Sequence, residues 1–374
     1  LPAADAPLEG RARRDERYPV HVTADREQTL AHVQAQLGDA THAAVVADET
    51  AHDLYGAEVV RALRGAGADV EVHVVPAGEA TKDLEQAVAL WHGLAAGPIG
   101  RRDLVVALGG GVVCDLGGWV ASAYMRGIPY VNLPTTLLAQ VDGALGGKVA
   151  VNHRLAKNLL GAFHQPKAVI ADVSYLASLE RRHLSAGIAE CVKKAVIASP
   201  DYWAFIDARA RDLVDRRDPA ALHALVRAAA AIKTALIERD PYEIDLRRPL
   251  NFGHTIGHPL ETVTGYGPLL HGEAVAFGMV AETRIAAARG LCEPALLDAL
   301  IDLLQRLSLP ATAADLRRAP RGADLVAAME KVRLIRAGSL RFVLPVALGE
   351  TLIADDVTDG EVTRALQACG LDGW

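Results

Sequence analysis

The chain has 374 residues, of which 51% are apolar and 23% charged, and its formal net charge is −7. A single hydrophobic core stops growing beyond about 250–300 residues, so the length predicts two domains. The acidic balance, together with the lack of a run of roughly 20 apolar residues, gives no reason to expect nucleic acid or a membrane as a partner. The four cysteines form no C-x-x-C pair and no signal peptide is visible, so we expect a cytoplasmic protein.

The first half of the chain alternates β-rich runs with helical stretches, after a loose tail predicted for residues 1–17. This alternation predicts a Rossmann-like α/β nucleotide-binding domain over residues 18–175, with a parallel sheet covered on both faces. The expected strands are 18–23, 42–48, 68–76, 103–109 and 130–134, and the expected helices between them are 51–65, 81–93 and 114–124.

The second half changes to an alanine- and leucine-rich helical periodicity, clearest over 217–239 and 294–307. One late run, 339–345, has the pattern of an isolated strand. We therefore predict a mainly α-helical domain over residues 176–374. The active site is expected between the two domains, because parallel sheets bind ligands where loops leave the carboxyl ends of the strands.

Three glycines, Gly109 to Gly111, directly follow an apolar strand and precede a helix. Such glycines let a pyrophosphate approach the backbone, and the helix N-terminus supplies N–H donors. Thr135 and Thr136 follow the next strand, and Asp48 ends an earlier strand, where its carboxylate is placed to bind a ribose. Each feature alone is also typical of ordinary turns; together they favour a dinucleotide.

Three histidines lie close together in the sequence of the helical half. His254 and His258 are four residues apart and share one helical face, and His271 follows after a loop. A lone histidine is more often structural, but this group predicts a divalent metal site. Glu190 is the candidate carboxylate ligand, on a helix that also carries Lys193 and Lys194.

A polar stretch from residue 142 to 158 combines exposed glycine backbone with Lys148, Asn152, Lys157 and Asn158. This composition suits a phosphorylated substrate, although a solvated loop explains the stretch alone about equally well. Three further cations, Arg126, Lys233 and Arg247, are candidates for anion binding, although singly each is typical of a surface salt bridge.

Six segments carry specific combinations of glycine, histidine and charged residues: 109–115, 133–142, 146–163, 187–193, 250–258 and 270–275. Taken together and in this order, they resemble the 3-dehydroquinate synthases, which belong to the sugar phosphate cyclases. The resemblance runs from about residue 18 to the end of the chain. It implies a dehydroquinate synthase-like fold, in which a nucleotide-binding domain precedes a helical metal-binding domain, and usually a homodimer.

The resemblance also implies cofactors and site residues. A zinc or cobalt ion would be held by Glu190, His254 and His271. NAD would be bound by Asp48, Glu79, Lys82, Gly110, Gly111, Asp115, Thr135, Thr136, Lys157, Ser178 and Leu179. The catalytic and substrate-binding residues would be Asp142, Lys148, Asn158, Lys193, Asn251 and His258, together with Lys233, Arg247 and Arg126, the last acting across a dimer interface.

The reaction implied by this resemblance is the cyclisation of a seven-carbon sugar phosphate with loss of phosphate. A ring hydroxyl is transiently oxidised by NAD⁺, with the metal as Lewis acid on its oxygen. The neighbouring C–H becomes acidic, phosphate takes that proton as it leaves by β-elimination, and hydride then returns from NADH. Ring opening and an intramolecular aldol reaction close the carbocycle.

The substrate has two close candidates. Lys233 and Arg247 match basic positions of the dehydroquinate synthases and slightly favour their carboxylated substrate, 3-deoxy-arabino-heptulosonate 7-phosphate. Against this, residues 332–334 read Val-Arg-Leu where the family usually has Asp-Lys-Lys, so a lysine near the substrate is missing. This change favours a sedoheptulose 7-phosphate cyclase, a 2-epi-valiolone or 2-epi-5-epi-valiolone synthase. A metal-dependent polyol dehydrogenase is a remote alternative.

Overall fold

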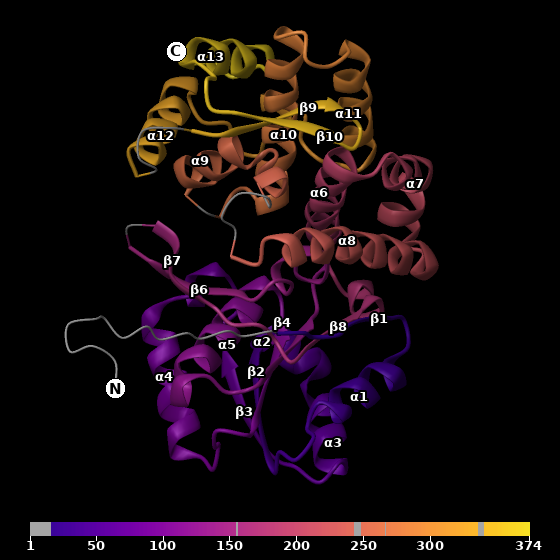
Figure 1. The fold of residues 1–374 in the computed structure, drawn as a ribbon, viewed down its shortest axis with the longest axis vertical. Coiled ribbons are helices and arrows are strands. Elements are labelled where there is room, and N and C mark those ends of the chain that lie inside the picture. The colour runs from indigo at the N-terminus through magenta and orange to yellow at the C-terminus, as the bar shows by residue number, and fades with distance from the viewer. Residues whose placement is uncertain (1–15, 155, 243–247, 266, 336–339) are drawn as a thin grey trace, which may run out of the picture.

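The structure is a computed structural model that describes residues 16–154, 156–242, 248–265, 267–335 and 340–374. Figure 1 shows two stacked parts, an N-terminal sheet with its helices below and a mainly helical C-terminal part above. Helices α6 and α8 lie between them in this view.

The N-terminal part is built on a parallel sheet with strand order β1-β8-β5-β4-β2-β3. Successive β2 side chains pack on opposite faces: Ala43 and Val45 join one apolar cluster, and Ala44 and Val46 the other. This is the doubly covered sheet that the alternating pattern predicts. The strands are Val20–Thr23 (β1), His42–Asp48 (β2), Asp69–Val75 (β3), Leu104–Gly109 (β4), Tyr130–Pro134 (β5) and Ala168–Asp172 (β8).

The helices of this part connect successive strands across the sheet. They are Arg26–Ala35 (α1), Glu49–Ala51 (α2), Ala57–Gly65 (α3), Leu84–Ala96 (α4) and Gly111–Ala123 (α5), with short helical turns at Glu79–Thr81 (η2), Tyr124–Arg126 (η3), Ala139–Gly143 (η4) and Val173–Ala177 (η5). The expected strands and helices of this half agree with these elements to within a few residues at each end. Strand β8 was not predicted.

An antiparallel hairpin, formed by Lys148–His153 (β6) and Ala156–Phe163 (β7), projects from the N-terminal part towards the helical part (Figure 1). The alternative of a solvated loop over this stretch is therefore wrong. The ladder pairs Lys148 with Phe163 and Val151 with Leu160, and its inner face packs Val149 and Val151 against the sheet domain.

The C-terminal part is mainly helical, as predicted, with one two-stranded ribbon. Its core contains buried residues of several helices and of this ribbon, including Val192, Phe277, Leu303 and Phe342. The elements are Arg181–Ala198 (α6), Pro200–Arg211 (α7), Pro219–Arg239 (α8), Arg248–Asn251 (η7), His254–Thr264 (α9), His271–Ala288 (α10), Pro294–Arg306 (α11), Gly322–Ile335 (α12), Phe342–Ala347 (β9), Glu350–Ala354 (β10) and Asp359–Ala368 (α13).

Among the described residues, only helix α8 is long and apolar enough to cross a membrane by length and composition. The mean hydropathy of its most apolar 18-residue window is 1.5. The helix contains no unbroken run of roughly 20 apolar residues, because His223, Arg227 and Lys233 interrupt it. Its buried residues include Leu222, Leu225, Val226 and Ala229, which join the core of the helical part. This packing is typical of the core helix of a globular domain.

Candidate active site

The carboxyl ends of β2 and β4 meet where the order of the sheet reverses, which is the position where such sheets bind ligands. Asp48 ends β2, and its Oδ1 accepts a hydrogen bond from the Ala51 backbone N–H at 2.9 Å. Gly110 and Gly111 follow β4 and begin α5. A Cβ added at Gly111 would have no described atom within 4 Å, so the backbone at this helix N-terminus is open to a ligand.

The predicted cofactor residues from separate segments are joined by hydrogen bonds. Lys82 donates to the Asp115 carboxylate and to Oδ1 of Asn158 on the hairpin. Asn152 Nδ2 donates to Glu79 Oε1 at 2.8 Å, and Asn152 Oδ1 accepts from the Asn158 backbone N–H at 2.9 Å. The hairpin is therefore fixed to the edge of the predicted nucleotide site.

The other predicted cofactor residues border the same edge. Thr135 follows β5, and its backbone N–H donates to Gly109 O at 2.9 Å. Ser178 lies just after η5, where its hydroxyl is 2.5 Å from the Tyr55 hydroxyl. Leu179, next to Ser178, packs against the core of the helical part, so these two residues lie where the two parts meet.

A network of charges, most of them buried, lies between the two parts. Asp142 Oδ1 is 3.0 Å from the ammonium groups of both Lys194 and Lys233. Glu190 Oε2 pairs with Lys193 and lies 3.4 Å from Lys194. Burial alone would raise the pKa of the Glu190 carboxyl, but Lys193 and Lys194 hold that pKa well below its usual range. Glu190 is thus an anion in the folded protein.

The other carboxylate oxygen of Glu190 faces the histidines. Glu190 Oε1 lies 3.6 Å from His254 Nε2 and 3.7 Å from His271 Nε2. It is buried and has no hydrogen-bond partner among the described residues. An orphaned carboxylate oxygen facing two imidazole nitrogens is the arrangement a divalent cation would complete.

Both histidines use their other ring nitrogen in a hydrogen bond. His254 Nδ1 donates to Phe252 O, and His271 Nδ1 donates to Glu261 Oε2, each at 3.0 Å. These bonds direct Nε2 of each ring at the site, where it can ligate a metal once it carries no proton. The residues present therefore fit a zinc-type centre with three protein ligands and an open position for substrate.

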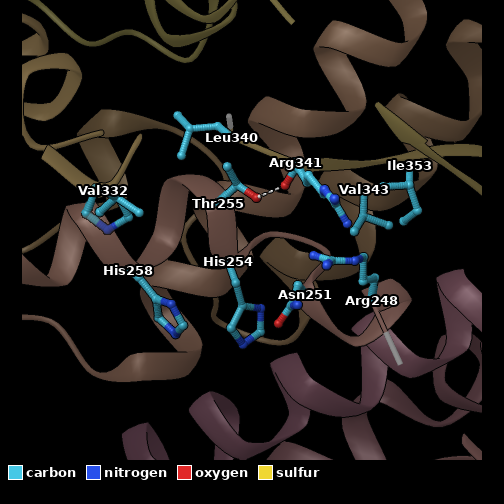
Figure 2. A pocket seen from close by; sticks show the side chains of 11 residues that line it. Arg248, Asn251, His254, Thr255, His258, Val332, Leu340, Arg341, Val343 and Ile353 are labelled. Carbon is cyan, nitrogen blue, oxygen red and sulfur yellow. Dashed lines mark hydrogen bonds between the residues drawn. The ribbon is translucent and has the colours of Figure 1, made fainter. Parts of the chain in front are cut away.

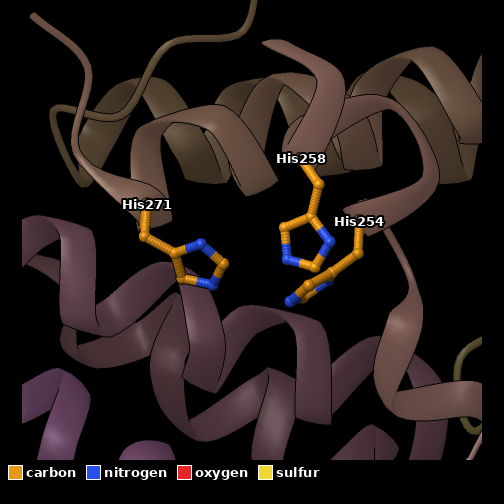
Figure 3. A group of neighbouring side chains, drawn as sticks. All are labelled: His254, His258 and His271. Carbon is orange, nitrogen blue, oxygen red and sulfur yellow. The ribbon is translucent and has the colours of Figure 1, made fainter. Parts of the chain in front are cut away.

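His258 also belongs to this cluster. One ligand nitrogen from each of His254, His258 and His271 lies within 4.8 Å of the others, and Figure 3 shows the three rings converging. His258 is exposed, unlike Glu190, so it lies on the open side of the site. This position suits the predicted contact with substrate.

A glycine allows two of the three helices that carry the candidate metal ligands, α6 and α10, to approach. Gly272, next to His271, packs against the backbone of Ala186 on α6. A Cβ at residue 272 would lie 1.8 Å from Ala186 O, so any side chain would force α10 away from α6. Because α6 carries Glu190, this contact sets the spacing between Glu190 and His271.

One pocket shares Asp142 and Lys233 with the charge network, and a second borders the histidines. The first, of about 440 Å³, lies between hairpin and helices and is lined by the predicted substrate residues Asp142, Lys148, Asn158 and Lys233, together with Asp115. Its volume suits a small ligand. The second lies beside the histidines (Figure 2) and is lined by Arg248, Asn251, His254, Thr255, His258, Pro259, Val332, Leu340, Arg341, Val343 and Ile353.

Sequence comparison connects this geometry to a known family. The models of the 3-dehydroquinate synthase N-terminal and C-terminal domains match residues 72–186 and 187–331. The chain belongs to the 3-dehydroquinate synthase family. The predictions of this family, of its two-part fold and of a cyclase rather than a polyol dehydrogenase are confirmed.

Named relatives within the family have different activities. A 2-epi-valiolone synthase of Actinosynnema mirum is 54% identical over 94% of this chain and 92% of its own length. A 3-dehydroquinate synthase of Symbiobacterium thermophilum is 43% identical over 95% of this chain and 98% of its own. The structure of a 2-epi-5-epi-valiolone synthase from Streptomyces hygroscopicus, with NAD⁺ and Zn²⁺ bound, has a TM-score of 0.88 and 30% identity, covering 97% of this chain and 99% of that one. The cofactors expected from the sequence are those that this structure holds.

Not every predicted site residue joins the cluster. Arg126 is exposed on η3 with a φ of 70° and lines neither pocket, so its role across a dimer interface stays a prediction. Arg247 lies outside the described residues. The domain limits, the homodimer and the cytoplasmic location also stay predictions.

Three acidic or basic residues of the site had no role in the sequence-based prediction. Lys194 links Asp142 to Glu190, and Glu261 binds His271. Glu282 on α10 is fully buried, and its Oε2 accepts from the Gly253 backbone N–H at the start of α9, at 2.9 Å. Helical spacing was an available signal for Glu261, which follows His254 by seven residues and His258 by three.

We expect kcat/KM to fall as the pH rises through about 8. Burial lowers the pKa of Lys233 to about 8, although Asp142 opposes this shift. Above that pH the free enzyme loses the charge of Lys233, which lines the larger pocket together with Lys148, so capture of an anionic substrate weakens. Lys233→Arg, which keeps its charge at all these pH values, should remove the decline. A wild-type profile that stays flat between about pH 7 and 9.5 would contradict this assignment.

Proposed function

We propose that this chain cyclises sedoheptulose 7-phosphate to 2-epi-valiolone with loss of phosphate, using NAD and zinc. The observation that carries the proposal is the Val-Arg-Leu run at residues 332–334, where the family usually has Asp-Lys-Lys, so that a lysine near the substrate is missing. Val332 lines the pocket next to the histidines, together with Leu340, Val343 and Ile353 (Figure 2). These four apolar side chains form a wall that offers no counter-charge to a substrate carboxylate.

Arg333 does not replace the missing lysine. Its Nη1 donates to Glu330 Oε1 at 2.8 Å, and its Nη2 donates to Asp359 Oδ1 at 2.5 Å. The guanidinium therefore binds α13, and Arg333 is absent from the lining of both described pockets. A substrate without a carboxylate suits this wall better than a carboxylated one.

The relatives support the same substrate. The 2-epi-valiolone synthase shares 54% identity with this chain, against 43% for the 3-dehydroquinate synthase of similar coverage. Both relatives belong to the same family. The difference in identity therefore bears on the choice of substrate, and the chemistry that the family shares is the same for either substrate.

The zinc ion, held by Glu190, His254 and His271, would supply a Lewis acid, and NAD⁺ would supply a reversible hydride acceptor. The remaining residues position and neutralise the substrate. Lys148 and Asn158 line the larger pocket, and their ammonium and amide groups suit the oxygens of a phosphate. Asn251 and His258 line the pocket beside the metal ligands, where they face the same substrate from the helical part.

Asp142 and its lysines keep this polar site ordered. Lys233 Nζ donates to the backbone carbonyl of Asp142 at 2.6 Å, and Lys194 joins the Asp142 carboxylate to Glu190. Fixed charges of this kind act on developing charge without reorganisation during the reaction. The site therefore has the elements that loss of phosphate and ring closure require.

The second candidate is a 3-dehydroquinate synthase. Lys233 lines the larger pocket, and Arg248 and Arg341 line the smaller one, so cations are available near the substrate from other elements. These groups are the specific observation in favour of a carboxylated sugar.

The test is phosphate release by the purified protein with NAD⁺ and Zn²⁺, with each seven-carbon sugar phosphate supplied separately. We expect release from sedoheptulose 7-phosphate and, at equal concentration, little from 3-deoxy-arabino-heptulosonate 7-phosphate. Release only from the carboxylated sugar would establish the second candidate. NADH should not accumulate in either case, since hydride returns to the product; steady accumulation would contradict any cyclase.

A further inference from the structure

Glu261 is a buried carboxylate that contacts a metal ligand and has no assigned function. It lies on α9, its residue is 4% exposed, and its Oε2 accepts the hydrogen bond from His271 Nδ1 at 3.0 Å. His271 comes from the first turn of α10, after a separate segment of chain. His271 is the first residue of its helix. The contact with Glu261 therefore fixes the orientation of its ring.

The other oxygen of Glu261 faces the N-terminal part of the protein. Lys157 Nζ, on strand β7 of the hairpin, lies 3.5 Å from Glu261 Oε1. The same ammonium group lies 3.5 Å from Glu79 Oε1, on η2 of the N-terminal part. A continuous path of contacts thus runs from Glu79 through Lys157 and Glu261 to His271, and the hairpin carries it between the two parts (Figure 1).

We propose that Glu261 is the positioning residue of the metal centre and that Lys157 holds it in place from the nucleotide-binding part, so that zinc affinity depends on docking of the hairpin on α9. The inference rests on the zinc ion assigned in the proposed function. A carboxylate that accepts from the outer nitrogen of a ligating histidine fixes the ring and raises its basicity. The Lys157 ammonium restrains this carboxylate, because its position between two acids favours one arrangement of all three groups.

A purely structural role predicts a different result. If Glu261 and Lys157 served only as an ion pair between the two parts, their loss would lower the free energy of unfolding without changing the affinity for metal. Metal affinity, measured on protein that is shown to be folded, separates these two roles.

The experiment measures zinc dissociation constants by competition with a chromophoric chelator, without NAD or substrate. Leaving out NAD removes any effect of the predicted contact between Lys157 and the cofactor. Glu261→Gln keeps the side-chain shape and an acceptor oxygen but removes the charge, and we expect the dissociation constant to rise about 10- to 100-fold. Lys157→Met should raise it by a smaller factor, of roughly 3- to 10-fold, since it acts through Glu261.

The matched control is Glu58→Gln. Glu58 lies on α3 of the N-terminal part, and its carboxylate pairs with Arg26 of α1. This variant should bind zinc like the wild type. As a second readout, the visible spectrum of the Co²⁺-substituted protein should change in Glu261→Gln and stay unchanged in Glu58→Gln, because only the first alters the ligand field through His271.

The outcomes are distinguishable. A wild-type protein that binds no zinc would overturn the proposed function, whereas a wild-type affinity in folded Glu261→Gln would overturn only this inference. If Glu261→Gln does not fold, Lys157→Met decides the question: a raised dissociation constant supports the path to His271, and an unchanged one rejects it.

Discussion

Replacing Glu190 by glutamine is expected to abolish stable zinc binding and to lower kcat/KM about a thousandfold, because a metal ion contributes several kcal/mol to such a reaction. Glu190 Oε1 is the buried oxygen that faces both histidines. Its other oxygen pairs with Lys193 and Lys194, so the substitution also leaves two buried ammonium groups without this counter-charge. We expect a loss of about 3–5 kcal/mol in the free energy of unfolding from that second effect.

A double variant separates the two effects of this substitution. Glu190→Gln with Lys193→Met removes the ammonium group that pairs with Glu190, whereas Lys194 keeps Asp142 as a partner, and it should recover part of the lost stability, measured by denaturant unfolding. Zinc content and turnover should stay as low as in the single variant. If the single variant retained zinc at wild-type affinity, Glu190 would not be a ligand, and the cluster of His254, His258 and His271 would have to hold the metal by itself.

The sequence predicts the sheet and the principal metal ligands because both depend on local patterns. The predicted strand 42–48 and the observed β2 have the same limits and both end at Asp48. The prediction succeeds because a buried parallel strand is a continuous apolar stretch bounded by polar residues. His254 and His258 share a helical face by spacing alone, and Glu190 was proposed as a ligand through the resemblance and its neighbouring lysines. These features need no knowledge of how distant segments meet.

The features that were missed arise from tertiary contacts. The stretch 142–158 reads as a glycine-rich loop, yet Lys148 pairs with Phe163 in a ladder whose inner face packs against α5. The role of Glu261 depends on His271, which arrives from another helix, and on Lys157 from another domain. The sequence also left Arg333 open as a substitute for lysine, and only its contact with Asp359 excludes that role.

Replacing Lys148 by methionine is expected to lower kcat/KM for the sugar phosphate about a hundredfold. Lys148 begins β6 and lines the larger pocket with Asn158, and its exposed side chain offers an ammonium group to an entering phosphate. A hydrogen bond to a charged group contributes about 1.5–3 kcal/mol, and phosphate is also the leaving group, so binding and elimination should both suffer.

The control is Lys167→Met, since Lys167 is exposed and its Nζ donates to Gln36 O at 2.6 Å on the N-terminal part. Lys167 lines neither described pocket, so this variant should keep wild-type kinetics. Zinc affinity should be unchanged in both variants, because neither lysine contacts Glu190, His254 or His271 in the described structure.

If Lys148→Met lost zinc as well, its defect would lie in the docking of the hairpin on α9. If Lys148→Met kept wild-type kinetics, the phosphate would have to bind elsewhere, and Arg248 and Arg341 beside the histidines would be the next residues to replace.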